Sequence, residues 1–370
     1  MKKYRIAGLM SGSSLDGLDI AVADFELKDI QPIKIEWKFI AAETIPLSDE
    51  WQQKLRTAST FNALDFCKLN AQLGHYFGSL VKNFLTTNNL NPDYIASHGH
   101  TIFHYPNEHF TVQIGDGAAI AANTGIDVIT EFRTTDVALG GQGAPLAPLA
   151  DKYLFDGYDF YVNIGGIANI SCNVDGQFYA FDTGAANQVL NALAQTIGKE
   201  YDENGKMAAS GTIHYQLLDA INDNTYYKKT YPKSLDNTWV QQNVLPHILN
   251  SSISLNDKLA TATEHTAQKL AEGIKAIIEK ENFVKKHYKM LITGGGAFND
   301  FLIKRINAQL KLIGIENLET IIPSKNIINF KEALLMGLLG LLRIEKIPNS
   351  IATSTGAKKD NINGCIYLGN

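Results

Sequence analysis

Hydrophobic positions along the chain alternate between short apolar runs and stretches with helical spacing. Short runs bounded by turn residues are typical of buried β-strands, whereas apolar residues three or four positions apart are typical of amphipathic helices. In the first part of the chain, this pattern predicts two helices, at Phe61–Phe84 and Asp116–Asn123. The strands predicted there are Tyr4–Met10, Ile20–Phe25, Ile33–Ile40, Tyr94–Ser97 and Ile126–Ile129.

The second part of the chain repeats this arrangement of strands and helices. Residues 222–231 in this part are polar, and we predict that they are exposed. Strands that alternate with helices indicate an α/β protein, and the repeat suggests two lobes with a cleft between them. The predicted helices are Ala186–Ile197, Asp257–Glu279 and Lys331–Ile344. The predicted strands are Phe160–Ile164, Asn169–Val174, Phe178–Phe181 and Lys289–Thr293.

A segment rich in Gly and Pro, residues 130–148, separates the two parts. A loop of this length inside a compact chain is usually functional, and it would also suit a hinge between lobes. We predict an N-terminal lobe of residues 1–130 and a C-terminal lobe of residues 131–370. The last segment of the C-terminal lobe is expected to pack back near the lobe boundary.

Composition narrows the class of protein. The chain has 370 residues, enough for about two domains, and 45% of them are hydrophobic, as in an ordinary globular protein. A net charge of −5 without a basic stripe argues against a nucleic-acid partner. The three cysteines form no CxxC pair, and no apolar run reaches the ~20 residues of a membrane span. Because the apolar start is also too short for a signal peptide, we expect a cytoplasmic protein with no membrane partner.

The most informative motif is the turn that follows the first predicted strand. Its glycines allow backbone N–H groups to approach an anion, and its serine hydroxyls can donate to phosphate oxygens. Asp16 and Asp19 are hard oxygen ligands that suit Mg²⁺, Asp16 through a water molecule. A plain hairpin turn is the alternative, and no Walker lysine follows. The candidate nucleotide-binding positions are Gly12, Ser13, Ser14, Leu15, Asp16, Gly17, Leu18 and Asp19.

Two more glycine turns follow predicted strands, within residues 163–169 and 291–299. A single glycine turn is weak support for ligand binding, but three of them after buried strands are more specific. They suggest a nucleotide between two lobes, with two turns at the phosphates and the third near the adenosine. The candidate positions in these turns are Asn163, Gly165, Gly166, Gly294, Gly295, Gly296 and Asn299.

Asp182 ends a predicted strand beside the expected cleft. A carboxylate there can accept a proton or orient a nucleophile, as kinases require. The alternative is that Asp182 caps the predicted helix Ala186–Ile197 at its N-terminus.

His98 and His100 form a rival constellation. Histidines two residues apart on a strand share a face and can bind one metal ion, a pattern found in metal-dependent hydrolases. No set of Asp, Glu or His residues with clear ligand spacing accompanies them. The other interpretation is a histidine that contacts a sugar or forms a structural hydrogen bond.

In their order along the chain, these motifs resemble those of the anhydro-N-acetylmuramic acid kinases. The family start Gly-x-Met-Ser-Gly-Thr-Ser-x-Asp-Gly-x-Asp is matched by Gly8–Asp19, with Ser13 in place of Thr. The Asn-x-Gly-Gly-x-Ala-Asn and Gly-Gly-Gly-x-x-Asn segments are matched by Asn163–Asn169 and Gly294–Asn299. Other family segments fit, some with substitutions, at Ser97–Thr101, Glu131–Leu146, Phe181–Asn187, Lys331–Ala333 and Thr355–Ala357.

The resemblance implies a two-lobed, actin-like ATPase fold of the ribonuclease H-like type, with a central nucleotide cleft. It also implies an enzyme that uses ATP with Mg²⁺ to open 1,6-anhydro-N-acetylmuramic acid with water. The product would be N-acetylmuramic acid 6-phosphate, an intermediate of peptidoglycan recycling. Asp182 falls on the catalytic aspartate that activates water, and His98, Arg133 and Glu332 fall on positions expected at the sugar. The partners are then the sugar and ATP, and a homodimer is also considered.

Besides Ser13, the chain departs from the family pattern at four places, which leaves room for a divergent member. The departures are His100 for Gln, Glu131 for Asp, Ala185-Ala186 for Pro-Gly, and Leu235–Asn237 for Gly-Arg-Glu. Two other classes stay open. One is a metal-dependent hydrolase that uses His98 and His100, and the other is a catalytically reduced ATP-binding regulatory protein.

Overall fold

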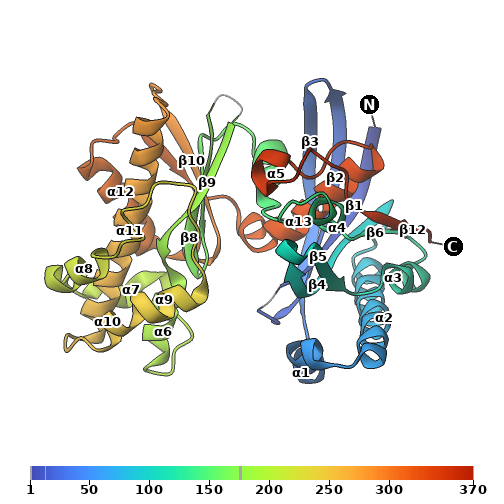
Figure 1. The fold of residues 1–370 in the computed structure, drawn as a ribbon, viewed down its shortest axis with the longest axis horizontal. Coiled ribbons are helices and arrows are strands. Elements are labelled where there is room, and N and C mark those ends of the chain that lie inside the picture. The colour runs from blue at the N-terminus through green and yellow to red at the C-terminus, as the bar shows by residue number, and fades with distance from the viewer. Residues whose placement is uncertain (1, 13, 175–176, 370) are drawn as a thin grey trace. The chain divides into compact units, whose positions relative to one another are not determined.

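The computed structural model describes residues 2–12, 14–174 and 177–369 (Figure 1). Its contacts divide the chain into two compact units. The first consists of Met1–Asp156 and Phe330–Asn370, and the second of Gly157–Asn329. This division differs from lobes of 1–130 and 131–370, because residues 131–156 carry no strand and are bound by side chains to the first unit. Trp37 Nε1, for example, donates to the Leu154 carbonyl at 2.8 Å.

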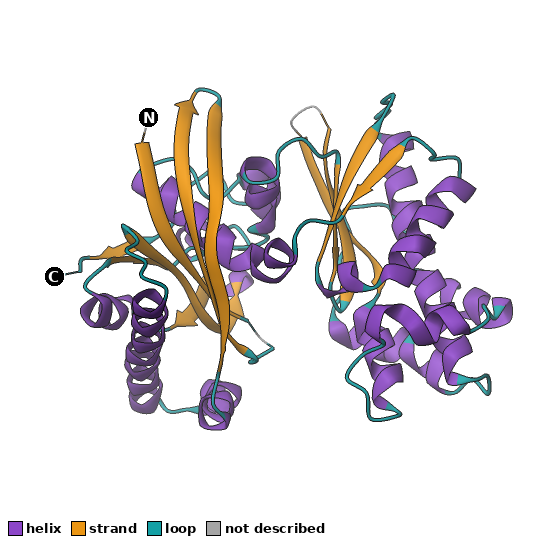
Figure 2. Ribbon diagram, turned by 180° about the vertical axis from the view of Figure 1, so that it is seen from behind, coloured by secondary structure: helices purple, strands orange, loops and turns teal. Residues whose placement is uncertain are grey.

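A seven-stranded sheet forms the first unit (Figure 2). Its order is β12-β6-β4-β1-β2-β3, and β5 pairs with β4. The first three strands form an antiparallel meander, whereas β4 and β6 run parallel to β1. The strands are β1 (Lys2–Ser11), β2 (Gly17–Ile30), β3 (Ile33–Pro46), β4 (Tyr94–Tyr105), β5 (Phe110–Ile114), β6 (Asp127–Thr130) and β12 (Cys365–Tyr367).

Helices cover both faces of this sheet, because the side chains of β1 alternate. Ala7 and Leu9 join the core beneath α2, whereas Gly8 lies against the backbone of α13. A Cβ atom at Gly8 would lie 1.8 Å from the Ala333 carbonyl oxygen, so only glycine fits there. The helices are α1 (Asp49–Thr57), α2 (Ala63–Thr87), α3 (Gly117–Thr124), α4 (Thr134–Ala138), α5 (Ala147–Tyr153), α13 (Lys325–Ile344) and α14 (Ala352–Thr355).

A five-stranded sheet with the order β11-β10-β7-β8-β9 forms the second unit. Here too the first three strands are antiparallel, and the next two run parallel to the first. The strands are β7 (Phe160–Ile164), β8 (Ile167–Val174), β9 (Gln177–Ala185), β10 (Tyr288–Thr293) and β11 (Leu318–Ile321). The helices are α6 (Asn187–Gln195), α7 (Lys206–Ser210), α8 (Tyr215–Asn222), α9 (Asn237–Asn243), α10 (Leu245–Leu249), α11 (Leu255–Lys280) and α12 (Asp300–Leu312).

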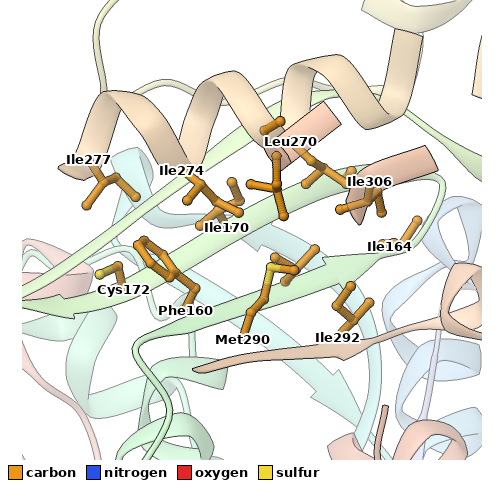
Figure 3. Packing of buried hydrophobic residues seen from close by; sticks show 14 of the residues in the cluster. Phe160, Ile164, Ile170, Cys172, Leu270, Ile274, Ile277, Met290, Ile292 and Ile306 are labelled. Carbon is orange, nitrogen blue, oxygen red and sulfur yellow. The ribbon is translucent and has the colours of Figure 1, made fainter. Parts of the chain in front are cut away.

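The core of the second unit lies between its sheet and α11 (Figure 3). Leu270, Ile274 and Ile277 of α11 point onto strand residues that include Phe160 and Ile170. Since strand side chains alternate between faces, the intervening residues of β7, β8 and β9 face away from α11.

Both sheets have the same strand order. In the second unit the order is β9-β8-β7-β10-β11, and in the first unit the corresponding strands are β3-β2-β1-β4-β6. The first sheet has β5 and β12 in addition. The α/β fold is confirmed, and the repeated order is that of the actin-like, ribonuclease H-like fold. The prediction that residues 222–231 are exposed is wrong for Tyr226 and Tyr231, which are buried. No helix in the described ranges has the length and apolar character needed to cross a membrane.

Candidate active site

In the first unit, the turn between β1 and β2 contains two glycines in different surroundings. Gly12 has open space beside it, whereas Gly17 packs against β3. A Cβ atom at Gly12 would meet only the Ser14 hydroxyl, at 3.5 Å, whereas one at Gly17 would lie 2.6 Å from the Thr44 methyl. Leu15 and Leu18 are buried in the core, so only their backbones could meet a nucleotide. Ser13 lies outside the described residues.

Carboxylates gather beside this turn. The Ser14 hydroxyl donates to Asp16 Oδ1 at 2.6 Å, and the Thr44 hydroxyl donates to Asp19 Oδ1 at 2.5 Å. Burial raises the pKa of Asp19; the Thr44 hydrogen bond opposes this shift, while the charges of Asp16 and Glu332 add to it. The charges of Asp16 and Glu332 therefore both act on Asp19, although Glu332 comes from a distant part of the sequence.

These carboxylates fit Mg²⁺ in one particular way. No group of three or more His, Cys, Asp or Glu residues in the described ranges could hold a metal ion by itself. Mg²⁺ typically keeps several waters and uses one or two carboxylates together with substrate phosphates. The turn therefore suits Mg²⁺ that arrives with a nucleotide and not a metal held by protein ligands alone.

Arg133, which is partly buried, pairs with the buried His98 in the same unit. Arg133 Nε donates to His98 Nε2 at 2.9 Å, and Arg133 Nη1 donates to the Gly143 carbonyl at 2.9 Å. The other ring nitrogen of His98 lies 3.1 Å from the Gly99 carbonyl. Burial, followed by the charge of Arg133, lowers the pKa of His98 to about 3. His98 is therefore a neutral acceptor that orients a guanidinium.

His100 is engaged elsewhere. Its Nδ1 lies 3.0 Å from the Ser11 hydroxyl at the end of β1. Both nitrogens of His98 are in hydrogen bonds, and the described residues contain no metal-ligand group. The metal-hydrolase interpretation of these two histidines thus loses its support, and the structural hydrogen-bond interpretation holds.

Asp136 anchors the loop that carries Arg133. Its carboxylate accepts from the Gly143 N–H at 2.8 Å and from side chains of the C-terminal segment. These donors are Ser350 at 2.6 Å, Thr355 at 2.9 Å and Asn361 at 2.9 Å. Burial raises the pKa of Asp136, but the four hydrogen bonds outweigh it and leave the pKa below its usual value. The carboxylate thus stays charged, although the described residues contain no ion pair with it.

In the second unit, polar residues form a row across four strands. Thr293 of β10 is opposite Asn163 of β7, Asn163 is opposite Asn169 of β8, and Asn169 is opposite Asp182 of β9. Their neighbours Ile164, Ala168 and Phe181 pack toward α11, so Asn163, Asn169 and Asp182 lie on the other face. Asn169 was not among the predicted site residues, because its position opposite Asp182 depends on strand register.

The two glycine turns of this unit meet at one end of the sheet, because β7 and β10 are parallel neighbours. Asn187 Nδ2 donates to the Ile164 carbonyl at 3.0 Å and holds the first turn against α6. A Cβ atom at Gly165, Gly166 or Gly295 would make only ordinary contacts, so these glycines are not packed against other atoms. Gly294 has φ +82° and Gly296 packs against Ile164, so these two shape the turn. Asn299 caps α12 by accepting from the Leu302 N–H at 3.0 Å.

Asp182 is held by the backbone of a distant loop. Its Oδ2 accepts from the Leu235 N–H at 2.7 Å, and its carbonyl accepts from the Tyr226 hydroxyl at 2.7 Å. Burial raises the pKa of Asp182, and the Leu235 hydrogen bond opposes the shift. A β-bulge lies next to it, between Ala168 and Asn169 of β8, a distortion that is common beside active sites.

Asp182 does not cap the following helix. Helix α6 begins at Asn187, five residues later, and its N-cap residue Ala186 provides no side-chain hydrogen bond. The helix-cap interpretation is therefore wrong. A partly buried carboxylate with a raised pKa, on a polar face of the sheet and outside any ion pair in the described residues, suits proton transfer.

Comparison with known proteins assigns the family. The family model described as anhydro-N-acetylmuramic acid kinase matches residues 4–369. A protein named anhydro-N-acetylmuramic acid kinase from Francisella tularensis subsp. novicida (strain U112) is 34% identical, with 99% of each chain covered. One of the same name from Coxiella burnetii (strain Dugway 5J108-111) is 35% identical, covering 100% of this chain and 99% of its own.

Solved structures are similar at a lower level. The activator of the 2-hydroxyisocaproyl-CoA dehydratase from Clostridium difficile, with bound ADPNP, is 14% identical with a TM-score of 0.43. That comparison covers 92% of this chain and 96% of the other, and the likeness is too weak to bear on function. The full-length match to the family model and the relatives above 30% identity decide the assignment: the chain belongs to the anhydro-N-acetylmuramic acid kinase family.

Proposed function

We propose that this protein uses ATP to open 1,6-anhydro-N-acetylmuramic acid with water and to phosphorylate the freed 6-oxygen. The product is N-acetylmuramic acid 6-phosphate, which feeds the recycling of cell-wall amino sugar. Family membership supports the kinase reaction. The placement of Asp182, a partly buried carboxylate with a raised pKa on a polar face of the sheet, is the observation that carries the chemistry.

Asp182 is the proposed general base. In this sugar the 6-oxygen is tied to the anomeric carbon, so it has no proton for a base to remove. Asp182 instead takes a proton from water while the water oxygen bonds to the anomeric carbon. The bond from that carbon to the 6-oxygen breaks, and the 6-oxygen bonds to the γ-phosphorus as ADP leaves. A general base contributes about 10²–10⁴-fold to the rate.

The remaining site residues take binding roles in the proposal. The Gly12–Asp19 turn and the Asn163–Gly166 and Gly294–Gly296 turns bind the nucleotide through backbone N–H groups. Asp16 and Asp19 hold Mg²⁺, which when bound would neutralise charge on the phosphates. Arg133, oriented by His98, and Glu332 contact the sugar.

Two of the departures from the family pattern, Leu235–Asn237 and Ala185-Ala186, are compatible with these roles. Leu235 holds Asp182 through its backbone N–H, which any residue other than proline supplies. Asp236, in the same departing segment, caps α9 by accepting from the Trp239 N–H at 2.7 Å. Ala185 and Ala186 are buried and small. An active kinase is therefore favoured over a catalytically reduced regulatory protein.

A protein that takes ATP acts where ATP is supplied, so the proposed location is the cytoplasm. A homodimer stays a prediction, which light scattering of the purified chain tests.

Heavy-oxygen water tests the reaction. Turnover of anhydro-sugar and ATP in labelled water, quenched before the anomeric oxygen exchanges, should place the label at the anomeric position. The transferred phosphate should carry none. Label in the phosphate would mean that water attacks phosphorus and would overturn the proposal, as would Asp182→Asn enzyme with undiminished turnover.

A further inference from the structure

A cavity of about 430 Å³ lies in the second unit, between the edge strand β9 and helix α11. The segment 227–233 forms its third side. We call it the lysine pocket and define it by six of its lining residues. They are Tyr227, Lys229, Tyr231, Lys233, Lys269 and Glu272. Its volume falls in the range of small-molecule sites.

Positive charge in the lysine pocket exceeds negative charge. Four lysines line the pocket, Lys229, Lys233, Lys269 and Lys280, together with two glutamates, Glu272 and Glu279, so 4 − 2 leaves +2. The charges of Lys229, Lys269 and Glu272 act on Lys233. Glu272 already pairs with Lys269, at 2.7 Å. In the described chain, no carboxylate lies within 4.0 Å of the Lys233 ammonium, which sits 4.8 Å from the centre of the Tyr226 ring. Burial and the neighbouring Lys269 lower the pKa of Lys233. A partly buried cation without a counter-ion favours binding of an anion.

Aromatic rings provide an apolar wall. Tyr231 stacks on Phe181 with ring centres 4.8 Å apart, and the Lys269 ammonium lies 4.7 Å from the centre of the Tyr227 ring. The Tyr227 hydroxyl is buried and has no hydrogen-bond partner among the described residues. The pocket therefore combines cations, an apolar surface and an unused hydroxyl.

The lysine pocket is separate from the face that carries Asp182. Phe181 packs toward α11 and lines the pocket, whereas Asp182 points to the opposite face of the sheet. The two are joined by one loop, since the Asp182 N–H donates to the Lys233 carbonyl at 3.1 Å.

We propose that the lysine pocket binds a phosphomonoester carried on a small organic body. A phosphomonoester has a charge of about −1.5 to −2 at pH 7, which matches the excess of +2, whereas a single carboxylate would leave one ammonium unmatched. Tyr231 and Phe181 pack against the organic body, and Lys233 and Lys269 bind the phosphate oxygens. This assignment is independent of the reaction proposed at Asp182.

Calorimetric titration tests the proposal on the full chain, with a non-hydrolysable ATP analogue at saturation so that the nucleotide site is filled. The probes are a hexose 6-phosphate, inorganic phosphate and the unphosphorylated hexose. The hexose phosphate should bind one site per chain, inorganic phosphate more weakly, and the hexose not at all. Equal binding of the two phosphate probes would contradict the role of the aromatic wall.

Variants locate the site. Lys233→Met keeps the length of the side chain and should weaken hexose phosphate binding by at least about tenfold, the effect of one charge-assisted hydrogen bond. Lys229→Met, at an exposed position, gives a second test if Lys233→Met does not fold. The matched control is Lys304→Met, at an exposed position of α12 outside the lining, which should bind as the parent does.

Three results would overturn the proposal. They are no saturable binding of either phosphate probe, equal weakening by Lys304→Met, and loss of binding in Asp182→Asn with binding intact in Lys233→Met. The last result would place the probe on the Asp182 face of the sheet.

Discussion

Arg133 donates from Nε to Nε2 of His98 at 2.9 Å, which fixes the proton of His98 on Nδ1. The histidine thus acts as an acceptor that sets the direction of the guanidinium, while Gly143 fixes its Nη1. An arginine held in this way presents its remaining N–H groups in a fixed fork, which suits recognition of a carboxylate or of sugar oxygens.

Arg133→Lys should therefore damage sugar binding more than nucleotide binding. Lysine keeps the charge but cannot form both bonds, so KM for the sugar should rise at least about tenfold, with KM for ATP nearly unchanged. Steady-state kinetics with each substrate varied in turn measure the two effects. An equal rise in both KM values would contradict a role at the sugar.

Gly12 and Gly17 should respond differently to valine. Gly12 has room for a side chain, so Gly12→Val should keep the melting temperature of the parent while ATP affinity falls at least about tenfold. Gly17→Val forces its side chain into β3 and should lower the melting temperature. Calorimetric ATP titration and thermal melts of both variants check this; ATP binding unchanged in Gly12→Val would refute the phosphate-turn assignment.

Asp182→Asn should lose catalysis and gain stability. We expect a rate about 10²–10⁴-fold lower, because the base is gone while the Leu235 hydrogen bond can persist. The pKa of Asp182 is raised in the folded protein, whereas in the unfolded chain it has its ordinary value of about 3.9. As pH rises above about 3.9, the unfolded chain releases this proton more readily than the folded protein does. The parent therefore loses stability as pH rises. The stability advantage of the variant should thus grow with pH. Urea unfolding across pH 4–8 measures it, and a variant less stable than the parent at pH 7 would count against a carboxylate whose pKa is raised by partial burial.

Asp136→Asn should destabilise the first unit by about 2–3 kcal/mol, since an amide places a donor against groups that already donate. The pKa of Asp136 is lowered, so its contribution is present above about pH 3.9 and is lost as pH falls through the folded-state value. The difference between parent and variant should therefore shrink in acid. Urea unfolding monitors this, and a pH-independent difference would mean that the charge of Asp136 contributes nothing.

His265 should make the second unit sensitive to acid. Burial, followed by the charge of Lys269, lowers the pKa of His265 in the folded protein to about 3. In the unfolded chain the pKa has its ordinary value of about 6.5. Below about pH 6.5 the unfolded state therefore binds a proton that the folded state does not bind, and stability falls. The resulting loss is about 2 kcal/mol at pH 5. His265→Phe keeps the edge-to-face contact with Tyr227 and should lose less stability between pH 7 and 5. Identical pH dependence in parent and variant would show that His265 does not titrate in this way.

The sequence by itself determined the α/β class, most of the strands, the glycine turns and the family, because these depend on local periodicity and on contiguous motifs. Tertiary structure decided how those motifs are used. The Asn169–Asp182 alignment depends on register across a bulge, and Leu235 reaches Asp182 from 53 positions away. Asp136 finds its partners more than 200 positions downstream, which moves residues 131–156 into the first unit. Contacts between residues so far apart leave no periodic trace in the sequence, since each side chain alone is compatible with many partners and only folding selects one.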